Sequence, residues 1–201
     1  MSTKYILHGG AIRASQDKGK AYFEEIVKNL GDNPRLLLCF FAQPEEEWGA
    51  KYQEWKERIT AALASIKPQF EMADRITYRQ QAERNDVLFI FGGDDDLLLD
   101  VAKKTEGFIA SLANLRVVTG SSAGAILLSD YSWCCDLRKV TRGLGIVPAN
   151  VLVHFGSSSY GSDDPRGPID WEKVEQELKN AVSNKYSIMR LHEGQFEIIE
   201  Q

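Results

Sequence analysis

The chain has 201 residues and a formal net charge of −5, with 43% hydrophobic and 26% charged residues. This composition is typical of a globular protein, and the length suits one domain that spans residues 1–201. The negative charge argues against a nucleic acid or an anionic membrane as partner, and no apolar run is long enough to span a membrane.

The first hundred residues alternate between short apolar segments and longer amphipathic segments, which predict buried strands and helices respectively. Strands are predicted at residues 5–7, 35–41, 70–76 and 86–91. Helices are predicted at residues 18–30 and 45–66, and a third helix begins at Asp94. In the helix at 45–66, large apolar residues recur three or four positions apart, which favours a core face over an aromatic ligand site.

The second half continues this alternation. A strand is predicted at residues 115–118, followed by a sharp turn and a helix, and another strand at 151–153 precedes a helix around 171–182. Two final strands, at 186–191 and 195–199, are predicted to pair as a C-terminal hairpin through the Glu193-Gly194 turn. The whole pattern predicts an α/β fold with a doubly wound, mostly parallel sheet sandwiched by helices.

The segment at residues 120–124 reads Gly-Ser-Ser-Ala-Gly and lies between a predicted strand and a predicted helix. A Gly-x-Ser-x-Gly turn in that setting is typical of a nucleophile elbow, in which the serine side chain points out of the sheet. Ser122 is therefore the candidate nucleophile. Because the motif fixes only three positions, a small-residue turn that lets the helix pack closely on the strand remains the alternative.

A serine nucleophile needs a base within hydrogen-bond reach and a carboxylate that orients the base. Of the three histidines, His154 is favoured because it ends a predicted strand and follows the elbow in sequence. The carboxylate candidates are Glu193 and Asp136. The plain alternatives are a structural histidine and solvated surface acids, since most Asp and Glu side chains lie at the surface.

An oxyanion hole requires two backbone N–H groups near the nucleophile. The N–H of Ala123, which follows the serine at a helix start, is one candidate, and the Gly92-Gly93-Asp94 turn can supply the other. A tight strand-to-helix turn is the alternative reading of this glycine pair. The acidic run that begins at Asp94 is assigned to a helix cap, so no metal and no cofactor are expected.

Taken together, these segments resemble peptidase family S51, the aspartyl dipeptidase and cyanophycinase group. The matching segments are Phe-Ile-Phe-Gly-Gly-Asp at 89–94, Ser-Ala-Gly-Ala at 122–125, Gly-Leu-Gly at 143–145 ahead of a strand and a histidine, and Leu-His-Glu-Gly at 191–194. The resemblance covers most of the chain in order and spacing. It implies a class I glutamine amidotransferase-like fold.

Carried onto this sequence, the resemblance makes Ser122 the nucleophile and His154 the general base. It favours Glu193 as the triad acid, with Asp136 as the alternative, and it assigns the oxyanion hole to two backbone N–H groups. Those groups belong to Gly93 and Ala123.

The sequence departs from the family pattern at two positions that bear on the substrate. Asp94 stands where the family often has asparagine, and Arg166 is the nearest candidate for the family's basic residue after the histidine, in a poorly matching context. Both are weak candidates for substrate binding. Tyr160 and the serines before it are assigned to a loop rather than to the substrate groove.

The function expected from these residues is a serine peptidase, similar to a dipeptidase, that hydrolyses short peptides through an acyl-enzyme. The alternatives are an esterase or amidase of small molecules on the same scaffold, and a homologue that binds without catalysis. A monomer or homodimer is expected. The absence of a secretory signal and of a disulfide framework favours a cytoplasmic location.

Overall fold

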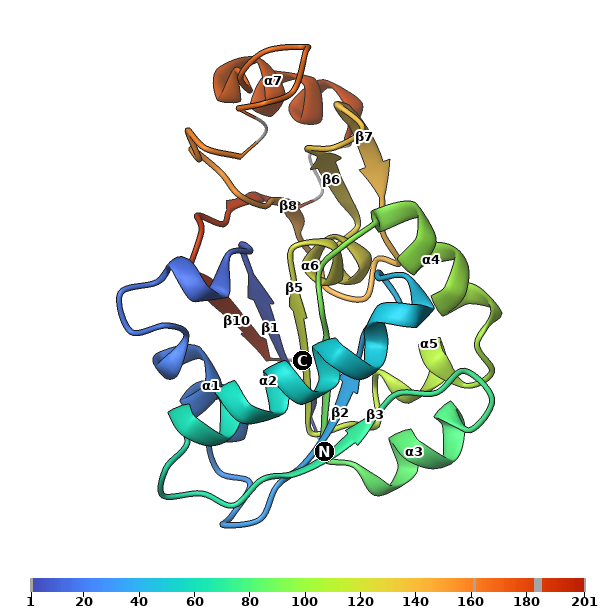
Figure 1. Ribbon diagram of the computed structural model, residues 1–201. Coiled ribbons are helices and arrows are strands. Elements are labelled where there is room, and N and C mark those ends of the chain that lie inside the picture. The colour runs from blue at the N-terminus through green and yellow to red at the C-terminus, as the bar shows by residue number, and fades with distance from the viewer. Residues whose placement is uncertain (1, 161, 183–185, 201) are drawn as a thin grey trace.

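The strands form two sheets within residues 2–160, 162–182 and 186–200, which the computed structural model describes (Figure 1). The larger sheet has the order β10-β1-β5-β4-β2-β3, and the smaller sheet has the order β7-β6-β8-β9. The larger sheet consists of β1 (Lys4–His8), β2 (Arg35–Cys39), β3 (Gln69–Met72), β4 (Val87–Ile90), β5 (Val117–Ser121) and β10 (Phe196–Glu200). The smaller sheet consists of β6 (Tyr131–Cys134), β7 (Lys139–Arg142), β8 (Asn150–Leu152) and β9 (Ile188–Arg190).

The central strands of the larger sheet are buried on both faces, which explains their nearly continuous apolar sequence. Every residue of β4 and β5 is buried, and so are the last four residues of β2. All neighbouring strands in this sheet run parallel except β10, which pairs antiparallel with β1 at the edge. The carboxyl ends of β1, β4 and β5 therefore meet at one edge of the sheet.

Helices cover the larger sheet in two groups. The helices and short 3-10 turns are η1 (Ile12–Ala14), α1 (Lys20–Val27), η2 (Glu45–Glu47), α2 (Trp48–Ala62), α3 (Tyr78–Arg84), α4 (Asp95–Lys104), α5 (Phe108–Ser111), α6 (Ala123–Leu128) and α7 (Trp171–Ala181). Helix α1 packs on α2, whereas α5 packs on α3 and α4. The connections that contain α1 and α2 run along the sheet toward β3, whereas those that contain α3, α4 and α5 run back toward β1. Because such connections are right-handed, the two groups lie on opposite faces of the sheet.

The smaller sheet and α7 lie beyond the carboxyl ends of β1 and β5, as Figure 1 shows at the top of the molecule. Val174 and Leu178 of α7 are buried against Trp133 and Leu152 of the smaller sheet. This second apolar cluster holds the segment after β8 above the edge where β1 and β5 end. Among the helices of the described residues, none is long and apolar enough to cross a membrane.

The predicted α/β architecture with a mostly parallel sheet is confirmed, but the predicted C-terminal hairpin is wrong. Strand β9 pairs in parallel with β8 in the smaller sheet, whereas β10 pairs with β1 in the larger sheet. The physical reason is that β1 and β8 each offer an open strand edge. The backbone N–H and C=O groups of β10 are paired at the edge of β1, and those of β9 are paired at the edge of β8. The turn that contains Glu193 therefore carries the chain from one sheet to the other.

Candidate active site

The elbow places Ser122 directly after β5 and at the start of α6. Its backbone angles are φ 52° and ψ −113°, a strained conformation for a residue with a side chain. The two flanking glycines are required because there is no room for a Cβ atom at either position. A Cβ atom on Gly120 would lie 2.3 Å from the backbone of Gly124, and one on Gly124 would lie 2.3 Å from the carbonyl oxygen of Ile90. Close packing of α6 on the sheet thus forces the turn that exposes the serine hydroxyl.

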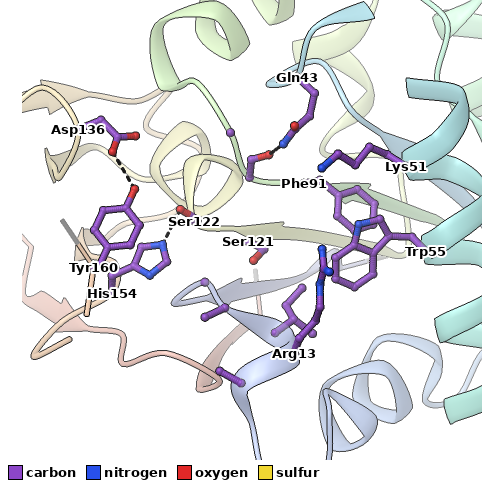
Figure 2. Close-up of a pocket in the computed structure, with 16 residues that line it drawn as sticks. Arg13, Gln43, Lys51, Trp55, Phe91, Ser121, Ser122, Asp136, His154 and Tyr160 are labelled. Carbon is purple, nitrogen blue, oxygen red and sulfur yellow. Dashed lines mark hydrogen bonds between the residues drawn. The ribbon is translucent and has the colours of Figure 1, made fainter. Parts of the chain in front are cut away.

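His154 follows β8 and also has a positive φ, of 53°. Its Nε2 lies 3.0 Å from Ser122 Oγ, and its Nδ1 lies 2.9 Å from Glu193 Oε1 (Figure 2 draws the first of these contacts). Because an ionised carboxylate can only accept hydrogen bonds, Nδ1 is the protonated nitrogen and Nε2 accepts from the serine hydroxyl. These three side chains form one continuous hydrogen-bonded series in which the histidine can take the serine proton.

Asp136, the alternative acid, lies elsewhere in the site. Its Oδ1 accepts a hydrogen bond from the Tyr160 hydroxyl at 2.9 Å. The Tyr160 ring stacks on the His154 ring, with centroids 4.1 Å apart and planes 24° apart. Burial, together with the neighbouring Asp136 carboxylate, holds the pKa of Tyr160 far above its usual value, so the phenol stays a neutral donor. The structure therefore places Glu193 on the imidazole and leaves Asp136 to anchor the stacked tyrosine.

Two backbone N–H groups flank the serine. Gly93 is exposed and has φ 149°, and its N–H has no acceptor within the described residues. A Cβ atom at this position would lie 2.2 Å from the carbonyl oxygen of Ala42, so only glycine fits. Ala123 opens α6, and the N–H of a first helical residue has no partner within its own helix. Both groups are suited to bind a negatively charged oxygen beside Ser122.

The serine and the histidine open into a pocket of about 470 Å³. Figure 2 shows its two sides, with Tyr160 and Asp136 near His154 and the side chains of Arg13, Lys51, Trp55 and Phe91 on the other side of Ser122. The indole of Trp55 and the ring of Phe91 lie 4.9 Å apart and form an apolar wall. Sites for small organic ligands commonly combine such walls with a few polar groups.

The charges of the pocket are arranged on opposite sides. Arg13 pairs with Glu54 at 3.0 Å, and Lys51 lies 3.8 Å from a carboxylate oxygen of Glu47. These basic side chains lie across the serine from the carboxylate of Asp136. Across the described residues, no group of three or more His, Cys, Asp and Glu side chains is arranged to hold a metal ion.

The two weak substrate-binding candidates lie outside the pocket lining. Asp94 is exposed and caps α4 by accepting a hydrogen bond from the backbone N–H of Leu97 at 2.8 Å. Arg166 binds the carboxylate of Asp164 and donates to the backbone oxygen of Asp136 at 2.7 Å. Each side chain is therefore bound to a local structural partner and does not line the pocket.

Several pocket residues carry no sequence motif. Tyr160 lines the pocket, so the preference for a loop without a role in the groove is wrong, and Arg13, Lys51 and Trp55 were not predicted there. Arg13 follows the glycines that end the first strand, a signal that could have placed it near the sheet edge. Lys51 and Trp55 lie on one face of a long helix, where the sequence indicates only amphipathic packing.

Comparison with known proteins identifies the fold. No family model matches the chain, and no curated protein sequence matches it. The crystal structure of a protein from Listeria monocytogenes EGD-e, which is named provisionally as a peptidase E, shares 17% identity with a TM-score of 0.66 over 100% of this chain and 98% of that one. A peptidase structure from an acI-B1 actinobacterium shares 17% identity with a TM-score of 0.59 over 99% of this chain and 84% of that one. The chain has a peptidase E-like fold, as the resemblance to family S51 implied.

Proposed function

We propose that this protein is a serine peptidase of short peptides, with Ser122 as nucleophile, His154 as general base and Glu193 as the acid that orients it. The observation that carries the proposal is the hydrogen-bonded series of these three side chains, at 3.0 and 2.9 Å, on a strained elbow that opens into a pocket. The peptidase names of the two similar structures support the same class of reaction.

In the proposed reaction, Ser122 Oγ attacks the carbonyl carbon of the scissile bond and passes its proton to Nε2 of His154. The N–H groups of Gly93 and Ala123 bind the oxyanion that forms. The histidine then donates the proton to the leaving nitrogen as the C–N bond breaks, which leaves an acyl-enzyme. Water then attacks this ester while His154 takes a proton from the water, and the histidine returns that proton to Ser122 Oγ as the ester C–O bond breaks and the acid leaves. Glu193 stays ionised and stabilises the imidazolium.

The pocket also supports a short substrate. Its volume of about 470 Å³ lies in the range of sites that enclose small molecules, rather than that of a long peptide cleft. Asp136 on one side and the Arg13 and Lys51 side chains on the other lie across Ser122, where the charged ends of a dipeptide can be accommodated. This arrangement supports a dipeptidase-like activity.

The decisive experiment compares Ser122→Ala with the wild type on a panel of dipeptides, longer peptides and simple esters. Loss of the nucleophile should lower kcat by roughly 10⁴-fold or more. The exposed, remote Ser65→Ala variant is the control and should match the wild type. A serine-directed phosphonate should label Ser122, as mapped by mass spectrometry. Full activity of Ser122→Ala, or labelling of Ser121, would refute the proposal, and turnover of esters alone would favour an esterase.

A further inference from the structure

The backbone of residues 8–10, at the end of β1, binds the nucleophile, the base and the residue next to the acid of the proposed triad. Its consecutive carbonyl oxygens accept hydrogen bonds from the N–H of Ser122 at 3.0 Å, of His154 at 2.8 Å and of Gly194 at 2.9 Å. Gly194 directly follows Glu193. The nucleophile, the base and the acid come from three distant parts of the chain, and this one segment binds the backbone of the first two and of the residue that follows the third.

The last residue of this segment lies against the imidazole of His154. A Cβ atom on Gly10 would lie 2.3 Å from Cε1 and 2.4 Å from Nε2 of that ring, and Gly10 has φ 99°. The backbone of Gly10 is therefore part of the wall that holds the ring. A small displacement of this backbone would move Nε2, the atom that accepts the serine proton in the proposed reaction.

The side chain of His8 holds this turn in place. Its Nδ1 accepts a hydrogen bond from the N–H of Gly10 at 3.0 Å, and the ring is fully buried with its centroid 4.4 Å from that of Tyr22. Burial, with a smaller contribution from His154, lowers the pKa of His8 to about 3. The ring is neutral at neutral pH, and the proton must lie on Nε2 because Nδ1 is the acceptor.

The same ring carries a feature that packing alone does not explain. Its Nε2 is buried and has no hydrogen-bond partner within the described part of the chain. A buried polar atom without a partner destabilises a fold, and an apolar side chain would avoid this cost. An apolar side chain lacks the Nδ1 atom, which accepts from the N–H of Gly10 at 3.0 Å and lies at a longer 3.5 Å from the hydroxyl of Ser121.

We propose that His8 is a positioning residue of the catalytic centre, whose neutral imidazole fixes the turn at Gly10 and thereby seats the ring of His154. The inference rests on the proposed function, since the base that it positions is His154. It assigns a role to a buried histidine that takes no part in the proton transfers. His154 depends on such support because its own backbone has a strained, positive φ.

The test compares His8→Asn with His8→Leu. Both substitutions remove the ring, and asparagine and leucine have nearly the same branched shape. Only asparagine carries an acceptor, its amide oxygen, at the position that Nδ1 occupies in His8. His8→Leu should lower kcat by about 10²-fold, the scale of a misplacement of about 1 Å, with KM changed less than about threefold. His8→Asn should retain kcat within about tenfold of the wild type. His8→Gln carries its oxygen one bond further out and should resemble His8→Leu.

Thermal unfolding separates positioning from loss of folding. His8→Leu leaves the buried N–H of Gly10 without its acceptor, whereas His8→Asn keeps an acceptor but buries an amide N–H2 group, so the two variants should unfold at similar temperatures although His8→Leu is the less active enzyme. Equal losses of kcat in the two variants would overturn the proposal, because the ring volume and not the acceptor would then matter. If His8→Leu does not fold, His8→Asn and His8→Gln decide, and equal activity in those two would overturn it.

The proposed function fails independently of this inference. Activity that survives in Ser122→Ala would refute the peptidase mechanism whatever the His8 variants do. An inactive Ser122→Ala together with a fully active, folded His8→Leu would refute only the role of His8. The rate at which the phosphonate labels Ser122 provides a readout that does not depend on substrate, and it should fall in His8→Leu and be retained in His8→Asn.

Discussion

The carboxylate of Glu193 lies 2.9 Å from Nδ1 of His154, although the two residues belong to connections between different strands. His154 follows β8 of the smaller sheet, and Glu193 lies in the turn that carries the chain from β9 of the smaller sheet to β10 of the larger one. Because both sheets anchor this turn, the position of the acid relative to the base is fixed by the whole fold and not by local sequence.

The assignment of the acid is tested by Glu193→Gln. An amide cannot stabilise the imidazolium as a carboxylate does, and it can hold the wrong tautomer of the ring, so kcat should fall by about 10²–10⁴-fold. The measurement is kcat with a dipeptide and with an uncharged ester that the wild type hydrolyses.

Asp136→Asn is the matched control for this variant. The amide group that it introduces still offers an oxygen to the Tyr160 hydroxyl, so kcat on an uncharged ester should stay within about tenfold of the wild type. The reverse order of effects, with the larger loss in Asp136→Asn, would transfer the role of triad acid to Asp136.

The elbow could be predicted from sequence because its requirements are local. A buried strand, two glycines and an apolar helix start follow one another without interruption, and the strained Ser122 and the tight contact between Gly120 and Gly124 lie within that segment. The parallel sheet could also be predicted, because its strands are apolar on both faces and are separated by helices. The helix predicted at 45–66 begins with a 3-10 turn and ends at Ala62 as α2.

The elements and contacts that could not be predicted from sequence depend on interactions between distant segments of the chain. Strands β6 and β7 are four residues each and have no strong alternation, and the seven residues of α3 have little apolar periodicity, so these elements form through their neighbours. The final strands resemble a hairpin in sequence, but open edges of two different sheets decide their pairing. Tyr160 likewise reaches His154 only because the smaller sheet lies above the elbow.

The stacked ring of Tyr160 gives a second prediction. Tyr160→Phe keeps the ring on His154 and loses only the hydrogen bond to Asp136, so kcat should stay within about threefold of the wild type. Tyr160→Ala removes the stack, and an aromatic contact of about 0.5–1.5 kcal/mol corresponds to a loss of roughly 2–12-fold in kcat. Equal losses in the two variants would mean that the hydroxyl, and not the ring, positions the histidine.

The packing of the elbow gives a third prediction, for stability. In Gly124→Ala the new methyl group would meet the carbonyl of Ile90 at 2.3 Å, so α6 must move from the sheet and the free energy of unfolding should fall by about 1–3 kcal/mol. Gly49→Ala is the control, because nothing lies within 4 Å of its added methyl group and the residue lies in α2. Alanine there should raise the free energy of unfolding by up to about 1 kcal/mol. Urea unfolding measures both changes.

A fourth prediction concerns Asp95, in the first turn of α4. Burial is the main cause that raises the pKa of this carboxyl to about 6. A hydrogen bond with Cys134 opposes the shift, and the nearby carboxylates, with Asp136 first among them, add to it. In the unfolded chain an aspartate has a pKa of about 4. The folded state therefore binds more protons between pH 4 and 6, and the free energy of unfolding must fall as the pH rises through this range.

Asp95→Asn removes the group that has to ionise in this half-buried position. Its free energy of unfolding should exceed that of the wild type at pH 7 and above, where the full cost of the buried charge is present. The difference should shrink as the pH falls through 6 and disappear near pH 4, where both folded proteins carry a neutral group. Asp96→Asn removes an exposed carboxylate from the same helical turn and should not reproduce the gain. Denaturant unfolding of the three proteins from pH 4 to pH 8 measures the effect. If Asp95→Asn raised the free energy of unfolding by the same amount at every pH, the ionised carboxylate of Asp95 would not be destabilised by its surroundings.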